Sequence, residues 1–71
     1  MAGAMYEIEV RGRLAGAVTR WPDELEVTAS EPDVTHLHGW FADQAALQGV
    51  LRRLAALGVE LSSVRQMPDA S

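Results

Sequence analysis

Two histidines, His36 and His38, stand two residues apart in a stretch of alternating residues. If that stretch is a β-strand, both imidazoles point to one face, and Glu7 or Glu9 on a neighbouring strand can supply an oxygen atom. Imidazole and carboxylate bind zinc and similar ions, but nothing in the sequence provides a third ligand. We therefore interpret His36 and His38 as surface histidines and expect no metal and no cofactor. Histidine beside carboxylate titrates near neutral pH, which would make a contact surface here pH-sensitive.

The serines suggest a second chemistry, because Ser30, Ser62 or Ser63 with a histidine and an aspartate would form a hydrolase triad. No nucleophile elbow surrounds these serines, and no glycine-rich loop suggests an oxyanion hole. The six glycines are scattered, which argues against a phosphate-binding loop. The sequence predicts no catalytic residues and favours a protein that is not an enzyme.

The composition is that of one small globular domain, with 71 residues of which 48% are hydrophobic and 23% charged. Six basic and ten acidic residues give a net charge of −4, which disfavours nucleic acid as a partner because its binding needs clustered basic side chains. No long apolar run or signal peptide is seen, so we expect a cytoplasmic protein with no membrane partner. A small core without cysteine has no disulfide to stabilise it, which favours association.

Three stretches alternate with the two-residue period of half-buried strands, at residues 6–14, 25–30 and 34–41. In the second stretch, Leu25, Val27 and Ala29 share one side. Residues 15–23 lack a clean period and predict a loop or short distorted helix, which Trp21 anchors to the core. Residues 31–33, Glu-Pro-Asp, predict a turn that makes a hairpin of the second and third strands.

The second half of the chain predicts a capped helix. Asp43 is a suitable N-cap, and Gly58 supplies a left-handed stop. Between them a helical stripe is expected to be buried, formed by Leu47, Val50, Leu51, Leu54 and Leu57. Gly39 and Gly49 suggest close approach by another element, with Gly39 allowing the helix to pack on its strand. A closing strand over 59–67 is expected to contain a bulge or to be buried on both faces, because Leu61 and Val64 have opposite parity.

This element order predicts an α+β domain, a ferredoxin-like βαββαβ fold with a short or degenerate first helix and a four-stranded antiparallel sheet. The usual strand order, 4-1-3-2, makes the first and third strands central and leaves one face uncovered. That face would carry Glu7, Glu9, Arg11, Arg13, His36, His38 and Trp40. We expect one domain over residues 5–67, an N-terminal extension over 1–4 that a tag remnant would explain, and a frayed tail over 68–71.

Four short motifs follow one another in the second half: Leu37-x-Gly39, Asp43-Gln-Ala-Ala-Leu47, Leu57-Gly-Val59 and Leu61-x-Ser-Val64. Their order resembles a widespread set of small bacterial proteins of unknown function, and the strong likeness covers a little under half of the chain. This resemblance implies a fold and a bacterial origin but no activity.

The strand-helix-strand unit of these motifs is also similar to the opening of ACT regulatory domains, which bind amino-acid effectors. In ACT domains the unit comes first, and the effector lies near a glycine just after the acid. Here the unit comes last, and Asp43 is followed by Gln44-Ala45. The likeness implies small-molecule sensing as an alternative function.

The residues together predict a small non-enzymatic interaction or accessory domain that works by association. Its partner would be a second copy, giving a homodimer, or a larger protein subunit. The expected contact residues are Arg11, Arg13, His36, His38 and Trp40, because arginine and aromatic side chains are enriched at interface centres. The alternatives are an ACT-like domain with a small molecule enclosed between two sheets, and a small enzyme with a pocket at the dimer interface.

Overall fold

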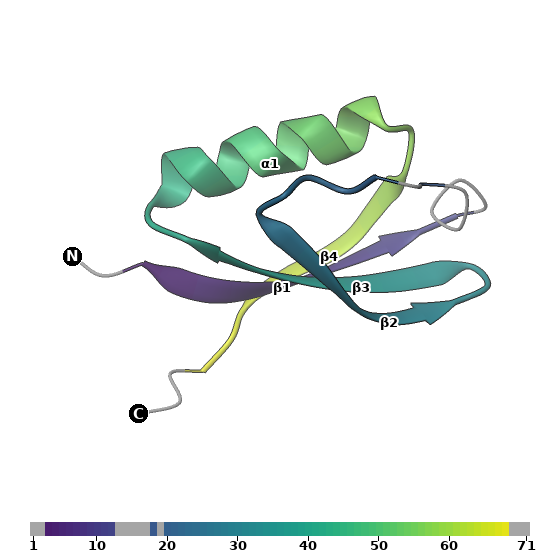
Figure 1. Ribbon diagram of the computed structural model, residues 1–71, viewed down its shortest axis with the longest axis horizontal. Coiled ribbons are helices and arrows are strands. Elements are labelled where there is room, and N and C mark those ends of the chain that lie inside the picture. The colour runs from purple at the N-terminus through teal and green to yellow at the C-terminus, as the bar shows by residue number, and fades with distance from the viewer. Residues whose placement is uncertain (1–2, 13–17, 19, 69–71) are drawn as a thin grey trace.

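A computed structural model describes residues 3–12, 18 and 20–68. It contains four strands and one helix, in the order β1 (Ala4–Arg11), β2 (Leu25–Glu31), β3 (Val34–Phe41), α1 (Gln44–Ala56) and β4 (Glu60–Gln66). The strands form one antiparallel sheet in the order β2-β3-β1-β4, with β1 and β3 central. The helix lies across one face of this sheet (Figure 1). The predicted α+β class and four-stranded antiparallel sheet are confirmed. Along the described residues, no helix combines the length and apolar character that a membrane span needs.

The core lies between α1 and the sheet. Its buried side chains come from β1, β2 and β3, from α1 and from the residue before β4: Ile8, Val10, Leu25, Leu37, Phe41, Leu47, Val50, Leu54 and Val59. The alternation predicted for β1 and β3 is confirmed, because every second residue of each strand faces this core. Trp21 packs against the same core, as expected of an anchor. Residues 20–22 are irregular, and the rest of the predicted loop or short helix, residues 15–17 and 19, lies outside the described residues.

Strand β1 ends earlier than predicted. The alternation continues to Leu14, but the strand stops at Arg11. The reason is Gly12, which adopts a φ of +107° and donates its N–H to the carbonyl oxygen of Asp33 at 3.0 Å. This backbone conformation suits glycine and breaks the strand after Arg11, and the predicted continuation through Arg13 and Leu14 lies outside the described residues.

Helix α1 begins and ends at the predicted residues. The Asp43 carboxylate accepts a hydrogen bond from the Ala46 N–H at 2.8 Å, and Gly58 has a φ of +85°. Most of the predicted stripe faces the core, with Leu47, Val50 and Leu54 buried and Leu51 half-buried. The prediction for Leu57 was wrong, because this side chain is 40% exposed. At 3.6 residues per turn the helix rotates Leu57 to the margin of the buried stripe.

A β-bulge in β4 resolves the opposite parity of Leu61 and Val64. Pairing with β1 shifts register between Glu9 and Val10, and Ser62 is the extra residue. Leu61 therefore lies opposite Val10 and Val64 opposite Ile8. Both side chains share the helix-covered face, as one of the two predicted arrangements requires.

A second bulge, in β2, was not predicted. Pairing with β3 shifts register between Val27 and Ala29, which leaves Thr28 as the extra residue. Ala29 lies opposite His36 and therefore on the uncovered face, so its expected place beside Val27 was wrong. The Thr28 hydroxyl lies 3.3 Å from the His36 carbonyl oxygen, to which it donates.

The two glycines singled out in the sequence have different surroundings. At Gly39 a Cβ would lie 2.8 Å from the carbonyl oxygen of Glu24 and 2.9 Å from a ring carbon of Phe41. The close neighbour is therefore Glu24, in the segment that enters β2. The helix, which was the expected neighbour, is not among the nearest atoms. At Gly49 a Cβ would meet nothing within 4 Å, so the close approach predicted there was wrong.

Candidate functional site

The face of the sheet opposite α1 is termed the open face. By register it carries Met5, Glu7, Glu9 and Arg11 from β1; Glu26, Ala29 and Glu31 from β2; Val34, His36, His38 and Trp40 from β3; and Glu60, Ser63 and Arg65 from β4. Four of the five predicted contact residues lie here, namely Arg11, His36, His38 and Trp40. The fifth, Arg13, lies outside the described residues.

One charged row crosses the open face at Glu7, which lies opposite His38 on one side and Arg65 on the other. The Arg65 guanidinium donates a hydrogen bond to the Glu7 Oε1 atom, and the His38 Nε2 atom lies 3.6 Å from the Glu7 Oε2 atom. The hydrogen bond from Arg65 is the main reason that the pKa of Glu7 lies below its ordinary value. Glu7 is therefore held as a carboxylate between two potential cations.

A second charged row is centred on Glu9. The Arg11 Nε–H is 3.0 Å from both the Glu9 Oε2 atom and the Ser62 Oγ atom, and the His36 Nδ1 atom lies 3.9 Å from the Glu9 Oε1 atom. Hydrogen bonding by the Ser62 hydroxyl, followed by that of Arg11, holds the pKa of Glu9 below its ordinary value. The bulge that adds Ser62 thus contributes directly to this row.

The histidines face separate carboxylates instead of converging on one point. His38 is beside Glu7, and His36 is beside Glu9. Within the described ranges, no group of three histidine, aspartate or glutamate side chains is arranged to hold a metal ion. Each imidazole therefore lies beside a carboxylate whose hydrogen bonds hold its pKa below the ordinary value.

The end of the open face is apolar. Trp40 lies opposite Met5, and their exposed fractions are 56% and 42%. The backbone of Gly3 packs on the indole, because a Cβ on Gly3 would lie 2.5 Å from the Trp40 Cζ2 atom. An exposed aromatic side chain with a charged surround is the usual make-up of an interface anchor.

Sequence reasoning missed the contribution of β4 to the open face. Arg65 and Ser62 make two of the hydrogen bonds described above. Arg65 was not a candidate residue, and Ser62 was considered only for a hydrolase triad. The alternation of β4 changes phase at the bulge, so its sequence does not tell which residues share a face with Glu7. The mismatch of Leu61 and Val64 was the only available signal.

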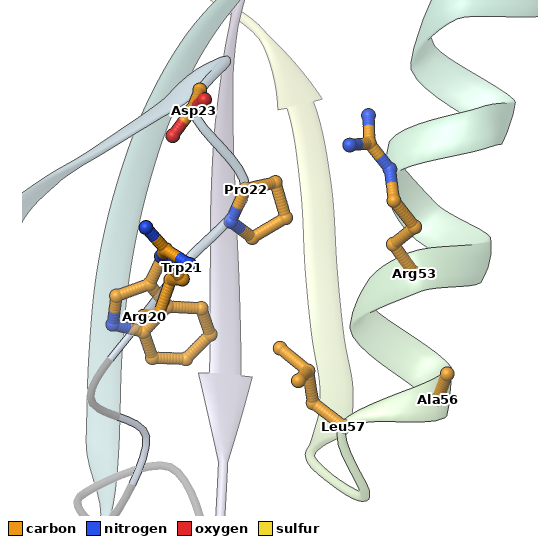
Figure 2. A pocket seen from close by; sticks show the side chains of 7 residues that line it. All are labelled: Arg20, Trp21, Pro22, Asp23, Arg53, Ala56 and Leu57. Carbon is orange, nitrogen blue, oxygen red and sulfur yellow. The ribbon is translucent and has the colours of Figure 1, made fainter.

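A groove on the helix side was also missed (Figure 2). It has a volume of about 470 Å³ and is lined by Arg20, Trp21, Pro22, Asp23, Arg53, Ala56 and Leu57. The Leu57 side chain points toward the Trp21 ring across this groove. Beside it, Arg53 donates to the Glu24 Oε2 atom at 2.6 Å and thereby holds the pKa of Glu24 below its ordinary value. This ion pair ties α1 to the segment that enters β2.

We expect the open-face ion pairs to make stability fall in acid. A carboxyl group whose pKa is lower in the folded state than in the unfolded state stabilises the fold at any pH above its unfolded-state pKa. That contribution is lost as the pH falls through the folded-state pKa. For Glu7 the loss therefore lies below its ordinary value of 4.5. Arg65→Met should flatten the dependence of unfolding free energy on pH between about pH 6 and 3, measured by urea titration. Arg52→Met, an exposed arginine on α1, is the matched control, and equal slopes for the wild type and Arg65→Met would contradict the assignment.

Fold and face together define a small α+β domain whose sheet is covered on one side and carries a charged surface with an aromatic end on the other. The chain belongs to the family described as "Domain of unknown function (DUF8691)", which matches residues 5–65. The match runs from the second residue of β1 to the penultimate residue of β4 and so includes the whole sheet apart from its ends. No curated protein and no solved structure matches the chain.

Proposed function

We propose that the chain is a small, non-enzymatic bacterial interaction domain and that its open face is the contact surface for a protein partner. The observation that carries this proposal is Trp40, whose side chain remains 56% exposed beside Met5 on a face that α1 does not cover. A large aromatic side chain contributes most when it is desolvated at the centre of an interface.

The charged rows of the open face are compatible with burial by a partner. Glu7 is bound by Arg65, and Glu9 by Arg11. Covering a charge is expensive chiefly when it is left without a counter-charge. Because both carboxylates have counter-charges within the chain, a partner can cover the rows without supplying its own, and Trp40 and Met5 then contribute the apolar contact.

The first partner to consider is a second copy of the chain. A domain of 71 residues without cysteine has a small core and gains stability when a further surface is buried. A symmetric contact brings the same face from both copies together and closes on itself. A larger protein subunit is the second partner, in which case the chain is an accessory domain.

The strand order supports a ferredoxin-like assignment. Counted from β4, the order is 4-1-3-2, and β1 and β2 run in the same direction on either side of β3. The chain between β1 and β2 must therefore cross over the sheet, as the first helix of a βαββαβ domain does. Trp21 packs against the core that α1 covers, and this contact supports a crossover on the helix-covered face, where the first helix of that fold lies.

Fluorescence and light scattering test the open-face contact. In a Trp21→Phe background Trp40 is the only indole, and we expect its emission to shift to shorter wavelength as the concentration rises through about 50 μM, in step with an increase in mass. Trp40→Ala should remove the part of the mass increase that comes from the open face and leave the helical circular dichroism intact. Val27→Ala removes a similarly exposed apolar side chain, 42% exposed, from the other face and is the matched control.

A monomer at every concentration, with Trp40 emitting as a water-exposed indole, would exclude self-association through the open face. The accessory role would then be the form of the proposal that survives. Equal mass increases for the wild type and Trp40→Ala would show that the open face is not the contact between copies.

Small-molecule sensing is the second candidate function, and the groove beside Trp21 favours it. Its volume of about 470 Å³ is in the range of ligand sites, and Arg20 and Arg53 flank an apolar floor of Trp21 and Leu57. A rise in melting temperature with an amino acid, lost in Trp21→Ala, would favour sensing over association.

A further inference from the structure

Strand β4 is an edge of the sheet and pairs only with β1 among the described residues. An edge strand presents backbone N–H and C=O groups that can pair with another strand. The run Glu60-Leu61-Ser62-Ser63-Val64-Arg65 is symmetric in character about its centre, with an acid and a base at the two ends, apolar residues next and serines in the middle. We propose that two copies of the chain pair antiparallel along β4, about a two-fold axis between Ser62 and Ser63.

This register makes each contact complementary. Glu60 lies opposite the partner's Arg65, Leu61 opposite the partner's Val64, and Ser62 opposite the partner's Ser63. The two-fold axis repeats each contact, so the interface contains two opposite-charge pairs and two apolar pairs. Cross-strand pairs of these kinds are the ones that stabilise antiparallel sheets.

The bulge in β4 is what permits the register. Residues directly opposite one another in an antiparallel ladder share a face, whereas Leu61 and Val64 would point to opposite faces of a regular strand. With Ser62 as the extra residue, Leu61 and Val64 both point to the helix-covered face. Glu60 and Arg65 likewise lie on the same face, the open one, because they are opposite Arg11 and Glu7.

The exposure of Leu61 and the charge of Arg65 both favour a second copy of the chain as the partner of β4. Leu61 is 44% exposed, and pairing with the partner's Val64 would cover it. The Arg65 side chain is 71% exposed and already donates to Glu7. A guanidinium has five N–H donors, so Arg65 can bind Glu7 of its own chain and the partner's Glu60 together.

The other edge of the sheet lacks this complementarity. Strand β2 has a bulge at the equivalent place, and the equivalent register would put Glu26 opposite the partner's Glu31 twice. Pairing of β2 with β4 would put one of the two β2 glutamates, Glu26 and Glu31, opposite Arg65 and the other opposite Glu60, so one of the two contacts would be repulsive. Such pairing would also join copies head to tail into an open chain. Only pairing of β4 with β4 gives attraction at both ends and a closed dimer.

The edge contact goes beyond the proposed function and does not depend on it. The edge contact uses the outer backbone of β4, whereas the open-face contact is centred on Trp40 and Met5, so each can form without the other. In the joined sheet both open faces lie on the same side, because residues opposite one another share a face.

Charge reversal tests the register. The wild-type chain should be a dimer by analytical ultracentrifugation, and Glu60→Arg, which puts arginine opposite the partner's Arg65, should weaken the dimer at least about tenfold. Arg65→Glu should do the same by facing the partner's Glu60. An equimolar mixture of the two variants should form a heterodimer of near wild-type affinity, because every opposing pair is then again of opposite charge. Glu31→Arg makes the same change on β2 and should have no effect.

Recovery in the mixture would support the register even if Arg65→Glu, which also removes the Glu7 contact, folds less stably. A dimer that survives Glu60→Arg but is lost in Trp40→Ala would overturn the edge contact and leave the open-face proposal standing. A dimer that is lost in Glu60→Arg but kept in Trp40→Ala would support the edge contact and exclude self-association through the open face. A wild-type monomer at several hundred micromolar would overturn the edge contact outright.

Discussion

Leu54→Ala is expected to lower the free energy of unfolding by about 2–5 kcal/mol, the usual cost of emptying a leucine site in a packed core. Leu54 is 1% exposed and is one of the three buried residues with which α1 packs on the sheet. A core in a domain of this size supplies little more than about 3–5 kcal/mol, so the variant should be largely unfolded at moderate temperature.

Urea unfolding followed by circular dichroism measures this effect. Two other leucines of the helix provide a graded comparison. Leu51→Ala should cost less because Leu51 is half-buried, and Leu57→Ala should cost least because Leu57 is 40% exposed. A cost below about 0.5 kcal/mol for Leu54→Ala would contradict the packing of α1 on the sheet.

Gly39→Ala is expected to destabilise the fold by about 1–3 kcal/mol, although alanine is one methyl group larger than glycine. The added Cβ would lie 2.8 Å from the Glu24 carbonyl oxygen and 2.8 Å from the Leu25 Cδ2 atom. The backbone oxygen cannot rotate away, so β3 or the segment entering β2 must shift. That shift would disturb the pairing of Leu25 with Gly39, where β2 begins.

Gly49→Ala is the matched control, and its effect should have the opposite sign. Gly49 lies inside α1, and a Cβ there meets nothing within 4 Å. Alanine favours the helix over glycine by about 0.8–1 kcal/mol, so this variant should be more stable than the wild type in the same urea titration. A neutral or stabilising Gly39→Ala would show that the segment entering β2 yields easily to the added methyl group.

The part of the candidate site that depends on alternation within one strand could be predicted from the sequence. Strict alternation in β1 and β3 put Glu7, Glu9, His36, His38 and Trp40 on one face before any pairing was known. It could not show that Glu7 binds Arg65, because these residues are 58 positions apart and meet only through the register of β1 with β4. The alternation also gave no sign of the groove beside Trp21, because that groove depends on where residues 20–23 lie relative to α1.

By itself the sequence determined the features that depend on neighbouring residues: the alternation of β1 and β3, the Asp43 cap, the Gly58 stop and the hairpin turn at 31–33. These follow from local sterics and hydrogen bonding, so they can be derived from short stretches. Only the tertiary structure decided the two bulges, the partner of each carboxylate and the opposite situations of Gly39 and Gly49. Each of these depends on which distant backbone lies alongside, and a shift of one residue in register moves every later side chain of a strand to the other face.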